Sequence, residues 1–319
     1  MIDDAVPMRK DIHLTREQAT DILSCWMGKR VSCQGIRQLD GGVCSGVFLL
    51  EFDESPHSAV VKMIDSLEDV PENDCLLRES RRLDFLHQHT NVSCPRVYLQ
   101  DRSGIAVPYS ILLLERLPGI NLWSANLTPD KRSHVERELA ETLLELHSHK
   151  RVTFGEMEEP GVTNFVDHFM PCLLEMRTDM NDFLSSAELE VLDGALVYAE
   201  DALRVQGEPT LIHGDAWAGN IMVHERSDGW HLSGLLDPVC LHYADVDSEL
   251  AHLEAFDTVY ETFFEVYTSQ KPLRPGYEFR RLFYWLHTYM VHVWLGHGSG
   301  FDDKVVATSK RVIDLARMI

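Results

Sequence analysis

His213-Gly214-Asp215-Ala216-Trp217-Ala218-Gly219-Asn220 is the most informative segment of this chain, and short apolar runs typical of strands flank it on both sides. It sets a carboxylate, Asp215, and an amide, Asn220, five residues apart in a loop. In a phosphoryl-transfer site, such a carboxylate can accept a hydrogen bond from an attacking hydroxyl group, while the amide oxygen joins a metal ion that bridges phosphate oxygens. The alternative is a structural loop in which Asp215 and Asn220 cap turns.

An acidic residue follows the next apolar strand. The run 232–236 ends at Asp237, seventeen residues after Asn220. A strand that carries an acid at its tip can place a hard oxygen ligand beside Asn220. Mg²⁺ requires near-octahedral oxygen coordination and usually keeps waters and substrate phosphates among its ligands, so two protein ligands suffice. The spacing therefore favours a magnesium site made by Asn220 and Asp237.

Together these motifs resemble the kinase-like superfamily, in its small-molecule branch of aminoglycoside phosphotransferases and fructosamine kinases. Those families carry a His-Gly-Asp-x-x-x-x-Asn loop followed by a metal-binding Asp, and this sequence has both in that order. The resemblance implies a two-lobed, α+β protein-kinase-like fold with a β-rich N-lobe and a mainly helical C-lobe. It also implies an ATP-dependent kinase in which Asp215 is the catalytic base and Asn220 and Asp237 hold Mg²⁺.

The N-terminal part contains further candidates for nucleotide binding. The glycine-rich segment 41–46, with Gly42 and Ser45, can fold over phosphates through its backbone N–H groups, although glycine turns are also common in hairpins. Lys62 closes an apolar run, as the strand lysine of kinases does, and Glu79 lies in the next helix, where kinases place the acid that pairs with that lysine. The alternatives are an edge-strand lysine that points to water and a solvated helix face.

Two later segments also resemble the phosphotransferase families. Glu115 and Leu117 follow a buried apolar run, and the segment resembles the hinge whose backbone groups hold the adenine edge. Further on, Asp245 and Glu249 match the families' Asp-x-x-x-Asp-Leu-Ala pattern, in which both acids would brace the catalytic loop. Glu249 stands where the families normally have Asp, which leaves its role open.

Local patterns predict a β-rich N-terminal part and a helical remainder. Thr15 begins the first helix as its N-cap, with Gln18 three residues later. We expect strands over 47–52, 58–63, 110–115, 211–212, 221–223 and 232–236, and helices over 75–89, 131–149, 165–184 and 188–203. The resulting prediction is a nucleotide-binding lobe over 1–115 and a catalytic and acceptor-binding lobe over 116–319.

Composition limits the partners and the compartment. The formal charge of −22, from 51 acidic and 29 basic residues, repels phosphate backbones, so we expect no nucleic-acid partner, whereas a cationic acceptor would be attracted. The seven cysteines form no Cys-x-x-Cys pair, which favours a reducing compartment. No segment reaches the roughly 18 apolar residues of a membrane span, and the N-terminus lacks a signal-peptide core. These features favour a cytoplasmic protein that makes no membrane contact, and they leave its oligomeric state open.

The acceptor is the least determined part of this interpretation. Trp217 and several C-terminal segments resemble the fructosamine kinases and favour a ketosamine acceptor, since an indole can stack on a sugar ring or attract an amine. A role for Trp217 in locking two lobes together is the alternative. An aminoglycoside or another antibiotic is the alternative acceptor, and a nucleotide-binding pseudokinase with a regulatory role is the alternative of another class. A metal-dependent hydrolase would need further ligands, which the sequence does not offer.

Overall fold

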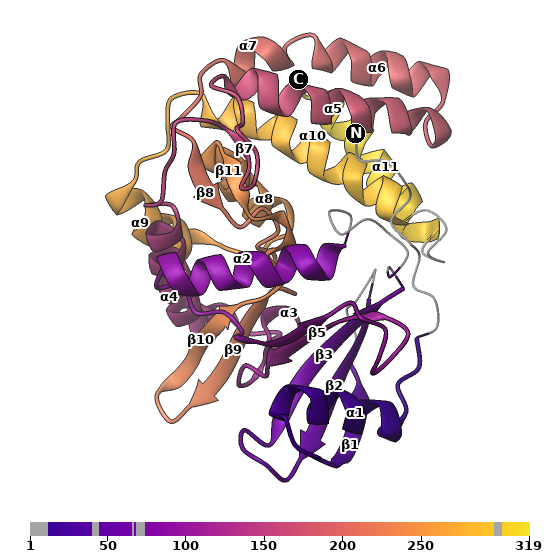
Figure 1. Ribbon diagram of the computed structural model, residues 1–319. Coiled ribbons are helices and arrows are strands. Elements are labelled where there is room, and N and C mark those ends of the chain that lie inside the picture. Colours follow the sequence, from indigo (N-terminus) through magenta and orange to yellow (C-terminus); the bar gives the residue numbers. More distant parts are fainter. Residues whose placement is uncertain (1–11, 40–44, 66, 68–73, 297–301) are drawn as a thin grey trace. The chain divides into compact units, whose positions relative to one another are not determined.

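Figure 1 shows the computed structural model, which describes residues 12–39, 45–65, 67, 74–296 and 302–319. The chain forms two compact units, the first from residues 1–126 and 219–239 and the second from residues 127–218 and 240–319. The polypeptide therefore leaves the second unit after Ala218 and returns to it at Cys240. The division at residues 115 and 116 expected from the sequence stays a prediction.

The first unit is built on an antiparallel sheet of five strands in the order β1-β2-β3-β5-β4 (Figure 1). These strands are β1 (Cys33–Gln38), β2 (Gly46–Phe52), β3 (Ser58–Ile64), β4 (Val97–Asp101) and β5 (Ser110–Glu115). Two helices accompany them: α1 (Arg16–Met27) contacts β1, and α2 (Cys75–His89) contacts β3, β4 and β5. The strands expected over 47–52, 58–63 and 110–115 and the helix over 75–89 are thus confirmed.

Period-two alternation in β3 determines which side chains enter the core of this unit. Ala59, Val61 and Met63 are fully buried and pack in one cluster with the apolar face of α1. Lys62 lies between two of them in sequence and so projects from the opposite face of the sheet. The expected N-cap of α1 is also confirmed, because the Thr15 side chain accepts a hydrogen bond from the Gln18 backbone N–H and Gln18 reciprocates.

A second, three-stranded sheet completes the first unit, in the order β10-β9-β6. Its strands are β6 (Ile120–Asn121), β9 (Ile221–Arg226) and β10 (Gly229–Leu235), and the one-turn helix α3 (Leu122–Ala125) follows β6. Gly119 precedes β6 with φ of 92°, and a Cβ atom there would lie 1.9 Å from the Val223 carbonyl oxygen of β9. Glycine is therefore required where the 116–121 segment crosses β9.

The second unit is mainly helical (Figure 1). Its helices are α4 (Pro129–Leu146), α5 (Phe165–Asp179), α6 (Ser186–Leu196), α7 (Ala199–Leu203), α8 (Val246–Ala255), α9 (Glu261–Gln270), α10 (Tyr277–Gly296) and α11 (Asp302–Ala316). A small sheet has the order β7-β11-β8 and consists of β7 (Gly155–Glu156), β11 (His242–Ala244) and β8 (Thr210–Ile212). α10 contacts α5, α7, α8 and α11, and its buried residues Phe283, Leu286, Met290 and Val293 lie in the main core of this unit.

Two helices differ from the sequence expectation. The single helix expected over 188–203 is divided into α6 and α7, because the chain bends at Val197 and Tyr198, whose side chains are exposed. The bend allows Ala199 and Leu203 of α7 to reach the core. The helix expected over 165–184 ends at Asp179 and continues as a short 3₁₀ turn.

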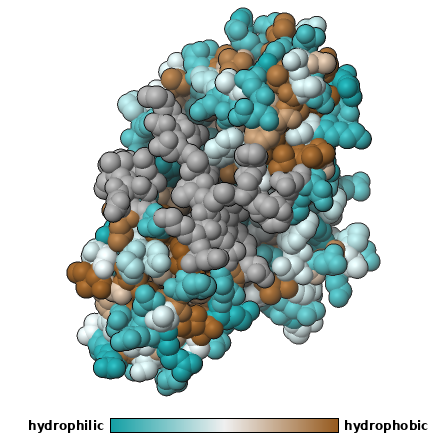
Figure 2. All heavy atoms as spheres, turned by 90° about the vertical axis from the view of Figure 1, so that its right-hand side faces the viewer, coloured by the Kyte–Doolittle hydropathy of each residue, from teal (hydrophilic) through white to brown (hydrophobic). Residues whose placement is uncertain are grey.

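The surface of each unit carries mixed polarity. On the face drawn in Figure 2, hydrophilic residues predominate and hydrophobic ones are interspersed among them. Within the described part of the chain, no helix combines the length and the apolar character needed to cross a bilayer.

Candidate active site

Lys62 is the centre of a charged cluster in the first unit. Its Nζ atom lies 2.7 Å from Glu79 Oε1, 2.8 Å from Glu79 Oε2 and 3.3 Å from Asp237 Oδ1. The lysine comes from β3, Glu79 from α2 and Asp237 from the end of β10, so three separate elements converge on one ammonium group. The structure thus adds Asp237, which the sequence suggested only as a metal ligand, to the predicted pair of Lys62 and Glu79.

Burial and charge act in opposite directions within this cluster. Burial disfavours the charged form of Lys62, but the carboxylates of Asp237 and Glu79 outweigh it and raise the lysine pKa. Burial raises the pKa of Glu79 to about 7, against the opposing effect of Lys62. Lys62 therefore stays protonated over the physiological range and offers a fixed positive charge.

Asn220 and Asp237 lie at the same end of the β9–β10 hairpin. Leu235 is paired with Ile221, and the Leu236 N–H donates to the Asn220 carbonyl over 2.8 Å, so the residue before Asp237 is bonded to Asn220. Arg82, one turn after Glu79 on α2, donates to the Val239 carbonyl and ties the segment after Asp237 to the same helix.

The donor set at this hairpin end suits a hard cation. The Asp237 side chain retains 42% of its surface, so its carboxylate stays accessible to an ion and its waters. Carboxylate and amide oxygens are the ligands that Mg²⁺ prefers in proteins. Asn220 and Asp237 would hold the ion, whose chemistry is to neutralise charge on the transferred phosphate.

The structure gives less information on the other residues predicted to bind the nucleotide. Gly42 lies outside the described residues, and Ser45 forms a bend immediately before β2. Glu115 ends β5 and its carboxylate accepts a hydrogen bond from the Arg96 backbone N–H, while Leu117 is buried. The nucleotide-binding roles of these residues stay predictions.

The loop that carries Asp215 belongs to the second unit up to Ala218 and follows β8. Glu249 of α8 accepts hydrogen bonds from the backbone N–H groups of His213, over 2.5 Å, and Gly214, over 3.2 Å. Gly214 has φ of 79°, and a Cβ atom there would lie 2.4 Å from the Cys240 carbonyl oxygen. The backbone immediately before Asp215 is therefore fixed on both sides.

The carboxylate of Glu249 is buried and is supported by histidines. Burial alone would raise its pKa, but the charge interaction with His147, together with those with His213 and His252, lowers the pKa to about 2. His147 Nε2 lies 3.6 Å from Glu249 Oε2, beyond hydrogen-bond distance, and its Nδ1 bonds to the Tyr267 hydroxyl over 2.7 Å. An ionised Glu249 thus holds the backbone of residues 213 and 214, a role that the sequence left open.

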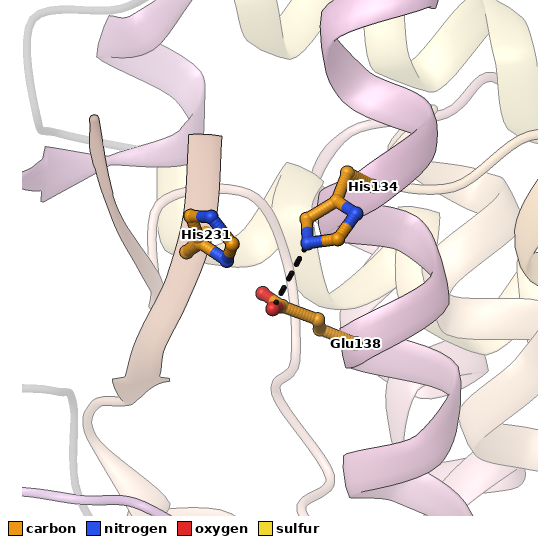
Figure 3. A group of neighbouring side chains, drawn as sticks. All are labelled: His134, Glu138 and His231. Carbon is orange, nitrogen blue, oxygen red and sulfur yellow. Dashed lines mark ion pairs between the residues drawn. The ribbon is translucent and has the colours of Figure 1, made fainter. Parts of the chain in front are cut away.

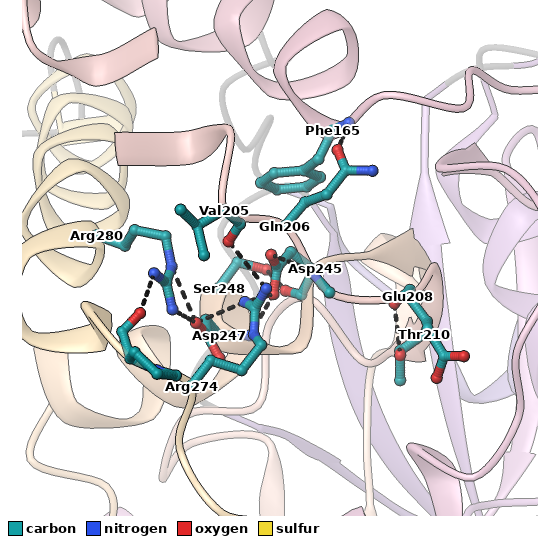
Figure 4. Close-up of polar contacts among 12 residues, drawn as sticks. Phe165, Val205, Gln206, Glu208, Thr210, Asp245, Asp247, Ser248, Arg274 and Arg280 are labelled. Carbon is teal, nitrogen blue, oxygen red and sulfur yellow. Dashed lines mark hydrogen bonds and ion pairs between the residues drawn. The ribbon is translucent and has the colours of Figure 1, made fainter. Parts of the chain in front are cut away.

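Asp245 contacts a different segment from Glu249, and Figure 4 shows the polar contacts of Asp245 with its neighbours. Its Oδ2 atom accepts from the Gly207 N–H over 3.0 Å, in the segment that leads into β8, and its Oδ1 pairs with Arg274. Arg274 and Arg280 also hold Asp247 Oδ2, each through an Nη2 atom at 2.6 Å. Asp245 therefore fixes the start of β8 through an Arg–Asp network, and Glu249 fixes the loop at its end.

Two side chains lie close to Asp215 or its loop. The Trp217 N–H donates to the Asp215 carbonyl over 3.0 Å, and the Trp217 ring centroid lies 6.3 Å from that of Phe256. His252 Nε2 lies 3.4 Å from Asp215 Oδ1. His252 was not predicted from the sequence. The available signal was its position three residues after Glu249, which puts both side chains on one helix face.

Two further histidine–carboxylate pairs have a local explanation. His134 and Glu138 face each other across one turn of α4, with 3.2 Å between Nε2 and Oε1 (Figure 3). In the first unit, His231 pairs with Asp228 over 3.0 Å within the β9–β10 hairpin. Each pair joins residues that are neighbours within one helix or one hairpin, and we assign neither to the site.

Proteins of similar sequence are phosphotransferases and ketoamine kinases. The sequence profile of the phosphotransferase enzyme family (APH) matches residues 35–283. A probable ketoamine kinase of Staphylococcus aureus is 25% identical over 229 residues, which cover 67% of this chain and 77% of that protein. A mouse ketosamine-3-kinase is 37% identical over 93 residues, which cover 29% of this chain and 28% of the mouse protein.

Solved structures share the fold at low sequence identity. A Haemophilus somnus protein provisionally named as a fructosamine-3-kinase superposes with a TM-score of 0.70 at 17% identity, covering 94% of this chain and 96% of that one. The aminoglycoside phosphotransferase APH(4)-Ia, in a ternary complex with AMP-PNP and hygromycin B, gives 0.70 at 16% identity, covering 94% and 98%. The α+β kinase-like fold predicted from the sequence is thereby confirmed. The family profile spans most of the chain, and this protein belongs to the phosphotransferase enzyme family as one of its kinases.

Proposed function

We propose that this protein transfers the γ-phosphoryl group of ATP, with Mg²⁺, to a hydroxyl group of a small molecule, and that the acceptor is a ketosamine. The observation that supports nucleotide binding is that the carboxylates of Glu79 and Asp237 both lie within 3.3 Å of the Lys62 ammonium group. A buried, permanently charged lysine next to a metal-binding carboxylate is suited to the α- and β-phosphates of a magnesium nucleotide.

In this proposal the chain's own groups divide the work. Lys62 holds phosphate oxygens, Glu79 holds Lys62, and Asn220 and Asp237 hold the metal ion. Asp215 accepts the hydrogen bond from the acceptor hydroxyl and takes its proton as the new oxygen–phosphorus bond forms. Glu249 keeps the loop of Asp215 in place through the backbone of residues 213 and 214.

The acceptor class rests on the sequence relatives and on the surroundings of Asp215. The relatives that match this chain are named as ketoamine and ketosamine kinases. Trp217 is partly exposed beside Asp215 and can stack on the apolar face of a sugar ring. The net charge of −22 favours an amine-bearing acceptor over an anionic one.

The nucleotide and base assignments are tested by two substitutions and one control. Asp215→Ala should lower kcat by about 10²–10⁴, the usual contribution of a positioned base, with ATP binding retained. Asp237→Ala should abolish magnesium-dependent ATP binding, measured by calorimetry with and without EDTA. The control is Asp228→Ala, which removes an exposed carboxylate from the turn of the same hairpin and should change neither quantity. Near-normal phosphorylation by both site variants would refute the assignment.

The acceptor is tested by an ATP-consumption screen with fructosamines, ribulosamines, aminoglycosides and simple sugars at fixed Mg²⁺. A ketosamine as the best acceptor supports the proposal, and the phosphorylated carbon can then be assigned by ³¹P–¹H correlation spectra. An aminoglycoside as the best acceptor would overturn the acceptor class and leave the kinase assignment intact. Tight ATP binding without transfer to any compound would instead favour a regulatory nucleotide-binding protein.

A further inference from the structure

Beside Asp215 lies a histidine that the proposed mechanism does not use. His252 Nε2 is 3.4 Å from Asp215 Oδ1, and the two side chains retain 14% and 37% of their surface. The imidazole is thus largely enclosed, whereas part of the carboxylate stays accessible.

The position of His252 is set by the same helix that braces the loop. α8 carries Glu249, which binds the loop backbone, and His252 three residues later, which faces the loop's carboxylate. Side chains at i and i+3 lie on one helix face. Since Glu249 fixes the backbone of residues 213 and 214, the spacing between α8 and Asp215 is fixed as well, and the contact of His252 with Asp215 follows from that spacing.

The other neighbours of His252 are aromatic or neutral. The Phe256 ring packs edge-on against it at 4.9 Å, and Phe256 also contacts His292 of α10 at 4.8 Å. The titratable groups that act on His252 are Asp215, Glu249 on its own helix, and His287 and His292 on α10. Burial, with smaller effects from His252 and His242, lowers the pKa of His287 to about 4, so His287 is neutral near pH 7. The charges that face His252 are therefore the two carboxylates.

We propose that His252 is a positioning residue for Asp215: when the acceptor binds, the buried Nε2–H group of His252, which makes no hydrogen bond in this structure, closes on Oδ1 and donates to it. This inference rests on the proposed role of Asp215 as the base. In the transfer step the acceptor oxygen bonds to the γ-phosphorus, the bond from phosphorus to the bridging oxygen of ADP breaks, and the hydroxyl proton passes to Oδ2. His252 keeps its own proton throughout.

Three variants test the role kinetically, with the best acceptor from the screen. His252→Ala should lower kcat about 10-fold, the value of one hydrogen bond to a charged group, with the KM for ATP unchanged. His252→Gln should restore most of kcat, because its amide N–H can reach the same oxygen. His287→Gln, a matched control on α10 whose ring packs on Phe169, should keep the wild-type kcat. A wild-type kcat in His252→Ala would overturn the inference.

A spectroscopic test needs no acceptor. Long-range ¹H–¹⁵N spectra of the full-length protein at pH 8 should show His252 as the Nε2–H tautomer, and Asp215→Ala should abolish that preference, whereas Asp228→Ala should not. A tautomer that is unchanged in Asp215→Ala would also overturn the inference. The two proposals fail in different ways. Full activity of Asp215→Ala would refute the role of Asp215 as the base. An inactive Asp215→Ala together with an unaffected His252→Ala would refute only the role of His252.

Discussion

At the scale of single residues, Lys62 shows what spacing in a sequence can and cannot predict. Its place at the end of an apolar strand and the acid at position 79 suggested a pair, and the structure has the two side chains 2.7 Å apart. The third member, Asp237, lies far along the chain, and only the fold brings it within 3.3 Å of the same ammonium group. The contact of His252 with Asp215 was missed for a related reason: its spacing from Glu249 predicts a shared helix face, but not the partner that this face meets.

We expect Lys62→Met to weaken magnesium-ATP binding at least 10-fold, because the ammonium that would hold phosphate oxygens is lost. The variant should also lose about 3 kcal/mol of stability, the usual cost of leaving a buried charge without its partner. Calorimetric titration and urea unfolding measure the two effects. Lys29→Met removes a lysine of the same unit from an exposed pair with Glu54 and should change neither; equal losses in both variants would contradict the specific role of Lys62.

At the scale of elements, long segments with clear periodicity were predictable and short ones were not. The helix over 75–89 and the strand over 110–115 have the expected bounds, since an apolar stripe or a continuous apolar run is a property of the segment itself. By contrast, β6, β7 and β11 have two or three residues each, and their backbone becomes a strand only through pairing with distant partners. β1 was missed because its sequence, CQGIRQ, is largely polar and lacks strand periodicity.

Gly119→Ala should destabilise the β6–β9 pairing, because the new Cβ atom would lie 1.9 Å from the Val223 carbonyl oxygen and the residue has φ of 92°. The expected loss is about 2 kcal/mol or more, measured by urea unfolding, with a weaker affinity for ATP because the expected hinge must shift. Gly194→Ala is the matched control: a Cβ atom there meets nothing within 4 Å, and alanine in helix α6 should be neutral or stabilising. A Gly119→Ala protein as stable as the wild type would show that the crossing can relax.

At the scale of the whole molecule, the histidines of the second unit set how stability depends on pH. Burial is the main cause that lowers the pKa of both His168 and His287 to about 4, with nearby histidines adding to it. An unfolded histidine titrates near 6.5, so below that pH the unfolded chain binds more protons than the folded one. The stability contributed by keeping these two rings neutral is present above about pH 6.5 and is lost as the pH falls toward 4.

We therefore expect the free energy of unfolding to be lower at pH 5 than at pH 7.5 by about 1 kcal/mol for each of the two histidines, after allowance for partial exposure. Urea unfolding at both pH values measures the difference. The double variant His168→Gln/His287→Gln should lose less stability between them, because glutamine takes up no proton. An identical pH dependence in wild type and double variant would assign the acid sensitivity to other groups.

The passage of the chain between its two units restricts how this protein can be divided. A fragment that ends at residue 126 would contain β6 without its partner β9, because residues 219–239 return to the first unit from far downstream. Conversely, a fragment that starts at residue 127 would carry the β9–β10 hairpin with no sheet to join. We therefore expect neither half to fold alone. A chimera of two relatives joined at a single position should fail to fold, unless residues 1–126 and 219–239 come from the same parent.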